Sequence, residues 1–219
     1  MTIKYRRVDL SDDDPIVTTT TPHTEYHRNG MCFRTDEYGR TVEVIVENLG
    51  YGDAPRHQLP RQLTGDEPSA TITYYPDSNT VILDNDPTVT FDPDDILSTH
   101  NGHIVANHLG GPADAFNIVP QTVHSNLKTY KEDVENPVDD VIDDNPDTKL
   151  SAVYRMTYSN DVDAIDFYAP RDFYADIYEA DSVADGAFDD VEPIDSFHHR
   201  HLYDPDLHDI DDDIDDVTW

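Results

Sequence analysis

An excess of acidic side chains constrains this chain more than any other feature of its sequence. Aspartate and glutamate together number 47 against 14 lysines and arginines, which gives a formal net charge of −33. Like charges at this density repel one another and oppose compaction in dilute buffer, whereas molar salt screens them within a few ångströms. The composition therefore predicts a protein of an extreme halophile, or a chain that carries much of its charge in extended tails.

The charge is unevenly distributed along the sequence. Residues 131–219 contain 28 acids and 5 bases, and residues 1–130 contain 19 acids and 9 bases. From Gly186 to the last residue, 12 acids accompany one base, a composition that buries too little apolar surface to become ordered. We therefore predict an irregular acidic leader over 1–29, a folded domain over 30–185 and a disordered acidic tail over 186–219.

Cys32 is the only cysteine, so the chain forms no intrachain disulfide and no zinc site built from cysteines alone. We expect any metal ion to be held by oxygen and nitrogen ligands. No apolar run approaches the length of a membrane span, and the first residues lack the apolar core of a signal peptide. These observations predict a protein made in the cytosol, with no membrane partner.

Apolar and polar residues alternate in the middle of the chain, as expected for β-strands. Residues 31–35 and 41–48 alternate on either side of a glycine-bearing turn at 36–40, which predicts a hairpin. A helix fits Thr122 to Asn136, and Pro137 is expected to end it. Further strands are expected at residues 70–75, 80–83, 150–158 and 165–178, the first two as a small hairpin.

Side chains suited to phosphodiester chemistry gather between His100 and Glu135. Hydrolysis of a phosphodiester needs a base that activates water, a metal ion that neutralises charge, and groups that position both. Histidine titrates near neutral pH and can act as the base, and a hard cation accepts the oxygen of an asparagine amide. This stretch therefore offers the groups for metal-assisted cleavage within one strand, loop and helix.

One ordered set of residues carries a family resemblance. The segment Asn101-Gly102-His103-Ile104-Val105-Ala106-Asn107-His108-Leu109-Gly110-Gly111-Pro112 precedes Asp114, Asn117-Ile118-Val119-Pro120-Gln121 and Asn126. Together with the upstream sequence from Phe33 to Val44, this order resembles the DNA/RNA non-specific endonuclease family, which includes DNA-entry nucleases and nuclease modules of polymorphic toxins. The resemblance covers about residues 30–64 and 99–178 and is specific over 100–126. It implies an α+β fold with a ββα-metal, or His-Me finger, core: an antiparallel β-sheet and one catalytic helix.

The resemblance also implies roles for individual residues. His103 would be the general base, and Asn126 the direct ligand of Mg²⁺, which Mn²⁺ can replace. Asn117 and Gln121 match family positions that brace the site or contact the metal-bound water and the phosphate. The implied partner is nucleic acid.

The first departure from the family concerns an arginine. The family commonly has Asp-Arg-Gly-His at the base, where this chain has His100-Asn101-Gly102-His103. The arginine that would stabilise transition-state charge is therefore missing from this position. Arg61 is our candidate for that role from the preceding loop, with Arg56 as the alternative.

The second departure concerns the supporting acid. The family tends to place a glutamate eight residues after the metal-binding asparagine, where this chain has Val134. Glu135 fits the family motif with a displacement of one residue, whereas Asp133 shares the face of Asn126 on a regular α-helix. Both acids remain candidates.

The leading function hypothesis is a Mg²⁺-dependent endonuclease that cleaves DNA, and RNA as a second substrate, without sequence preference. Three biological roles would share this core: a toxin module, a scavenging nuclease and a defence enzyme. A toxin module would have an inhibitor or immunity protein as its partner. The alternative is a catalytically silent nuclease fold whose acidic surface mimics nucleic acid. The histidines of the tail, from His198 to His201 and His208, are interpreted as solvated rather than metal-binding.

Overall fold

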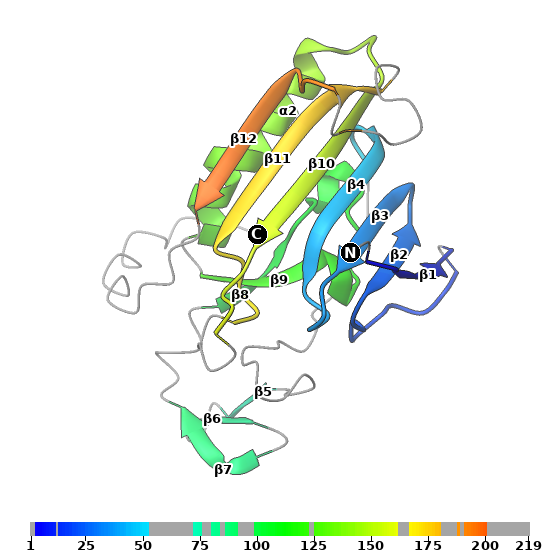
Figure 1. Cartoon of the computed structure of the whole chain (residues 1–219). Helices are drawn as coiled ribbons and strands as arrows, with labels where there is room; N and C mark the ends of the chain where they lie inside the picture. Colours follow the sequence, from blue (N-terminus) through cyan, green and yellow to red (C-terminus); the bar gives the residue numbers. More distant parts are fainter. Residues whose placement is uncertain are drawn as a thin grey trace.

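A computed structural model describes residues 3–11, 13–52, 72–75, 80–83, 86–91, 99–122, 125–161, 167–180, 188 and 191–200. Seven strands form the main sheet in the order β1-β2-β3-β4-β10-β11-β12 (Figure 1). Only the β1–β2 pair among these is parallel. The strands are β1 (Arg6–Asp9), β2 (Thr24–Arg28), β3 (Met31–Thr35), β4 (Thr41–Leu49), β10 (Leu150–Thr157), β11 (Asp172–Glu179) and β12 (Asp195–Arg200).

Two smaller sheets accompany the main one. The strands β5 (Ile72–Tyr75), β6 (Thr80–Leu83) and β7 (Asp86–Phe91) form an antiparallel sheet, which confirms the small hairpin and adds a strand to it. The strands β8 (Thr99–His103) and β9 (Ile118–Thr122) form an antiparallel ribbon. This ribbon carries the histidine that the sequence singles out, and the helix follows it directly.

The predicted hairpin over 31–48 is present as β3 and β4. Its alternation arises because Met31, Phe33, Val44 and Val46 are buried while the residues between them face outward. The strand expected over 150–158 is β10, and the strand expected over 165–178 begins later, as β11. These strands share one buried face, and β10 is buried on its other face as well, where Val153 packs with Tyr178 and Phe188.

The leader predicted to be irregular over 1–29 contributes two strands, so that prediction is wrong. Tyr26 of β2 is buried and stacks on Phe116 with 4.8 Å between ring centroids. Arg28 points inward from the same strand and pairs with the buried Asp114 at 2.8 Å. An arginine on the buried face hides the strand periodicity, because its carboxylate partner is far away in the sequence.

The predicted disordered tail over 186–219 is also partly wrong, because residues 195–200 form the edge strand β12. Phe197 packs against the core, and His199 is 2% exposed. The acids around this strand lower the average hydropathy of the region, but the strand itself buries alternate side chains. Residues 201–219 lie outside the described residues.

The helix starts at Ser125 and continues to Asp144, beyond the predicted end at Pro137. Its first turns, Ser125–Thr129 and Lys131–Glu135, are of the π type, and α2 (Asn136–Asp144) follows. A proline lacks the N–H that an α-helix pairs with the carbonyl four residues back. The turns before Pro137 are of the π type and pair with the carbonyl five residues back. Pro137 therefore stands in the first turn of α2, where a proline is tolerated, and the helix continues past it.

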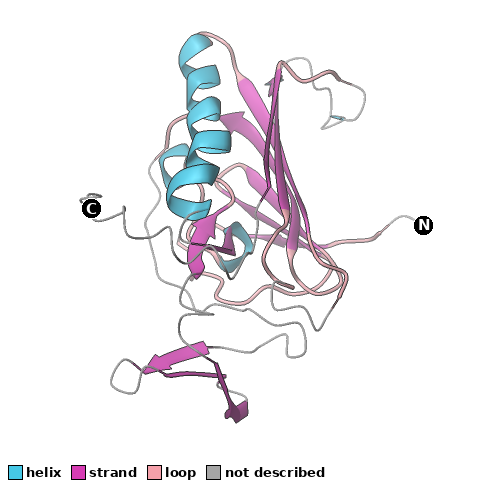
Figure 2. Ribbon diagram, turned by 90° about the vertical axis from the view of Figure 1, so that its left-hand side faces the viewer, coloured by secondary structure: helices cyan, strands magenta, loops and turns pink. Residues whose placement is uncertain are grey.

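The helix packs against one face of the main sheet (Figure 2). Tyr130, Val134, Val138 and Val141 form its buried side, three or four residues apart. Together with the inward residues of β2, β3, β4, β10 and β11 they form one apolar core. No helix in the described part of the chain is long and apolar enough to cross a membrane.

Candidate active site

The candidate site lies where the β8–β9 ribbon meets the start of the helix. His103 is the last residue of β8 and faces Ile118, the first residue of β9, in the register. Both strands contact the π-type turn Ser125–Thr129, which contains Asn126. Strand, strand and helix thus bring the predicted base and the predicted metal ligand into one region.

Asn117 fixes the loop that follows His103. Its side chain is fully buried, and its Oδ1 accepts a hydrogen bond from the Val105 amide at 2.9 Å. Its Nδ2 donates to the carbonyls of Val105 and Pro112, at 3.0 and 2.9 Å. The structure therefore places Asn117 as a brace of the loop, one of the two roles that the resemblance allowed.

Gln121 covers the glycine that precedes the predicted base. A Cβ atom at Gly102 would lie 2.4 Å from Gln121 Cδ, so no larger residue fits there without displacing the glutamine. The Gln121 side chain is fully buried, and neither its amide oxygen nor its amide nitrogen has a hydrogen-bond partner among the described residues. Buried amides normally have hydrogen-bond partners. The oxygen and nitrogen of Gln121 therefore leave one acceptor and one donor to be satisfied by a further polar group.

A hydrogen-bonded chain ties the start of the helix to β12. The buried His199 joins Ser125 Oγ through Nε2 and Asp133 Oδ2 through Nδ1, at 2.9 Å each. Ser125 is itself buried and directly precedes Asn126. His199 belongs to the histidine cluster that we interpreted as solvated tail, and that interpretation is wrong for this residue. The alternation of Phe197 and His199 was the signal that could have revealed it.

The two candidate acids have different surroundings. Asp133 is half-exposed and bonded to His199. Glu135 is intermediate in burial, and its charge adds to burial in raising the pKa of Tyr154, which is part of the core. Asp133 therefore contacts the edge strand β12. The charge of Glu135 instead influences Tyr154 of β10, a strand inside the sheet.

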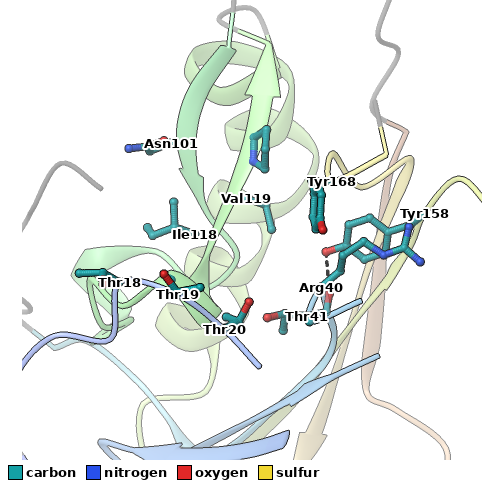
Figure 3. Close-up of a pocket in the computed structure, with 13 residues that line it drawn as sticks. Thr18, Thr19, Thr20, Arg40, Thr41, Asn101, Ile118, Val119, Tyr158 and Tyr168 are labelled. Carbon is teal, nitrogen blue, oxygen red and sulfur yellow. Dashed lines mark hydrogen bonds between the residues drawn. The ribbon is translucent and has the colours of Figure 1, made fainter. Parts of the chain in front are cut away.

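A pocket opens beside the ribbon (Figure 3). Its lining includes the three hydroxyls of Thr18–Thr20, Asn101 of β8, and Tyr168. The Tyr168 hydroxyl is buried and has no hydrogen-bond partner within the described ranges. The pocket thus presents several neutral hydrogen-bonding groups next to the strand that carries His103.

Arg40 is the cation on the pocket wall, but its guanidinium is already engaged. Its Nε donates to Asp36 at 2.7 Å. Its Nη1 donates to the carbonyls of Ser159 and Phe167. Arg40 therefore has a structural role. Arg61 and Arg56, the candidates for the missing catalytic arginine, lie outside the described residues.

The similarity of this chain to known proteins is found among solved structures. No protein-family model matches the sequence, and no curated protein matches it. Among solved structures, that of Sda1 nuclease with bound zinc ion is similar, at 15% sequence identity and a TM-score of 0.47, over 80% of this chain and 74% of that chain. Membership of the DNA/RNA non-specific endonuclease family stays a prediction.

Proposed function

We propose that this chain is a metal-dependent, sequence-non-specific endonuclease that hydrolyses phosphodiester bonds of DNA, with RNA as a second substrate. The observation that carries the proposal is the junction of β8, β9 and the helix start, where His103 and Asn126 come from contacting elements. The ordered motif led us to expect these two residues in one site. The brace by Asn117 supports the same reading, because it fixes the backbone directly after His103.

The donor set of the region fits a hard divalent cation such as Mg²⁺. Asn126 offers an amide oxygen and Glu135 a carboxylate, and Mg²⁺ prefers oxygen ligands with water in the remaining positions. The buried amide of Gln121, without a partner among the described residues, is a group that a metal-bound water or a phosphate oxygen would satisfy. When bound, Mg²⁺ would neutralise charge on the phosphate and on the leaving oxygen.

The π-type winding favours Glu135 over Asp133 as the supporting acid. A π-type turn takes about 4.4 residues, so Glu135, nine positions after Asn126, returns to the same side of the helix after roughly two turns. On an α-helix the same separation would place the two residues on opposite sides.

In this mechanism His103 would take the proton of the attacking water, and Asn126 and Glu135 would hold the metal ion. Asn117 and Gln121 keep the strand and loop in position. The pocket with Asn101, Tyr168 and the Thr18–Thr20 hydroxyls would receive a neighbouring nucleotide. Proteins usually bind a polyanion through a basic patch. A protein of net charge −33 has few cations to form one, so neutral hydrogen-bond donors would have to take over part of that role.

Replacement of His103 by alanine tests the proposal. Plasmid nicking with Mg²⁺ in molar KCl should fall by about 10²–10⁴-fold, the usual contribution of a general base. His108→Ala is the matched control, because His108 lies on the surface in an exposed pair with Asp139 and should keep its activity. Nicking by the His103 variant at the rate of the unmodified protein would refute the assignment.

Metal binding distinguishes the nuclease from the silent, nucleic-acid-mimicking alternative. The proposed enzyme binds Mg²⁺ or Mn²⁺ in the micromolar to millimolar range, whereas a silent fold has no need of it. Absence of binding together with absence of nicking would favour the alternative.

A further inference from the structure

The outward face of the β2–β3 hairpin gathers three chemically different metal ligands. His27 of β2 and Cys32 of β3 lie directly opposite each other in the register. Glu25 stands two residues before His27 and therefore on the same face of the strand. One ligand atom from each of the three side chains lies within 4.8 Å of the other two. We propose that Glu25, His27 and Cys32 bind a transition-metal ion of the Zn²⁺ class.

The backbone under these ligands is regular and paired on both sides. The turn between the strands is Asn29-Gly30, with φ of 56° and 72°, which matches the two-residue turn that suits a twisted hairpin. Strand β1 pairs with β2 on one side, and β4 pairs with β3 on the other. The ligands therefore project from the interior of a seven-stranded sheet, and metal binding needs no folding of a loop.

The carboxylate of Glu25 is already oriented for a metal ion. Its Oε2 accepts a hydrogen bond from Arg34 Nε at 2.9 Å, while its Oε1 lies 2.6 Å from His27 Nε2. Partners of this kind, behind a ligand, fix its orientation in metal sites. In the metal-free protein His27 and Glu25 lie at hydrogen-bond distance, and a metal ion bound by both would take the place of this contact.

The charges balance on binding. A divalent ion replaces the proton of the Cys32 thiol, which passes to solvent, and the neutral His27 ring binds the ion through Nε2 with its own proton on Nδ1. Thiolate and carboxylate then neutralise the two charges of the ion, and the imidazole is a neutral ligand.

Sulfur and nitrogen ligands select Zn²⁺ or Co²⁺ over Mg²⁺. The hairpin site shares no residue with the proposed catalytic site at His103 and Asn126, and neither proposal depends on the other. The expectation from the sequence that metals would have only oxygen and nitrogen ligands is therefore revised for this surface.

Titration with Co²⁺ tests the site in the full chain, reduced and first stripped of metal with a chelator. A cysteine thiolate bound to Co²⁺ gives a charge-transfer absorption in the near ultraviolet, which ligation by oxygen and nitrogen alone does not give. We expect this band to saturate at one ion per chain and to be lost in Cys32→Ser. His27→Gln should weaken binding by at least about 10-fold.

Asn126→Ala is the matched control and should keep the band unchanged, because its residue belongs to the other proposed site. Circular dichroism of each variant shows whether the sheet is intact, and zinc competition against a chromophoric chelator measures the affinity a second way. The proposal is overturned if the unmodified protein shows no band at millimolar Co²⁺, or if folded Cys32→Ser binds Co²⁺ and Zn²⁺ as tightly as the unmodified protein.

Discussion

Asn117 shows how one buried polar side chain can hold the candidate site together. It forms three hydrogen bonds to the loop after His103, and none of its surface is exposed. The resemblance left two roles open for this residue, a brace or a contact to water and phosphate. The hydrogen bonds favour the brace.

Asn117→Ala should therefore destabilise the protein as well as reduce its activity. The substitution leaves the amide and carbonyl of Val105 without their side-chain partner, at a cost on the order of 3 kcal/mol. Denaturant unfolding measures the change. A variant with full stability and reduced nicking would instead assign Asn117 a direct role with substrate.

Asp114 should be one of the most important single residues for stability. It is 1% exposed and bonds both the guanidinium of Arg28 and the amide of Val17, which joins the N-terminal strands to the site loop. Asp114→Asn leaves Arg28 buried without its counter-charge and should cost about 3–5 kcal/mol in denaturant unfolding. Arg7→Gln removes an exposed ion pair and is the control expected to show no change. Equal stability of both variants would contradict this view of the buried pair.

The Cys32 thiol should react slowly in the folded, metal-free protein. Burial raises its pKa to about 12, and the charge of Glu25 adds to the rise. An unfolded cysteine titrates near 8.5, so at pH 8 the folded protein holds almost no thiolate, and reactivity grows only as the pH approaches 12. Iodoacetamide labelling at pH 8 should be many-fold slower in buffer than in denaturant. Equal labelling rates would show that the thiol is open to solvent and ionised.

At the level of secondary structure, the π-type turns are the reason for proposing Glu135 rather than Asp133 as the supporting acid. Glu135→Gln should lower Mg²⁺-dependent nicking by at least about 10-fold while leaving stability nearly unchanged. Asp133→Asn removes the charged partner of His199 and should affect stability more than the chemical step. Nicking rates and unfolding curves of the two variants compare these effects. The opposite pattern would return the catalytic role to Asp133.

The sequence predicted the elements whose periodicity is visible locally, and missed those that depend on distant partners. The hairpin of β3 and β4 alternates within a few residues and was found. Strand β2 was missed because Arg28 occupies an inward position, although Asn29-Gly30 is itself a strong hairpin signal. The π-type winding could not be foreseen, because it depends on how the helix packs against the sheet and β12.

For the candidate site, the motif in the sequence pointed to His103, Asn117, Gln121 and Asn126. In the structure, the strands β8 and β9 pair with each other, and both contact the helix turn that contains Asn126. The motif could not supply the tie through His199, because that contact crosses from the helix to a strand more than sixty positions away. The pocket was also beyond reach, since its walls come from the N-terminal segment, the ribbon and the residues around Tyr168. Such arrangements are set by tertiary packing.

On the scale of the whole molecule, the outward face of the main sheet alternates cations and acids across the strands. Arg34 lies between Glu25 and Glu43, and Arg155 pairs with Asp176. The basic residues are too few to balance 47 acids, so repulsion over the rest of the surface remains. Salt should stabilise the fold by screening this repulsion.

The melting temperature should therefore rise steadily between 0.1 M and 3 M KCl. Differential scanning calorimetry measures it, and equal concentrations of a neutral osmolyte control for solvent exclusion. A melting temperature independent of KCl would mean that the net charge of −33 does not govern stability, and would remove the reason for expecting a halophilic protein.

The dependence of nicking on Mg²⁺ tests the central claim most directly. In molar KCl, nicking by the unmodified protein should be absent with EDTA and should rise to saturation with Mg²⁺. Asn126→Ala should shift the midpoint of that curve to at least about 10-fold higher Mg²⁺, while His103→Ala should lower the plateau and leave the midpoint in place. Nicking that persists in EDTA, or an unchanged curve for Asn126→Ala, would contradict a metal-dependent nuclease built on these two residues.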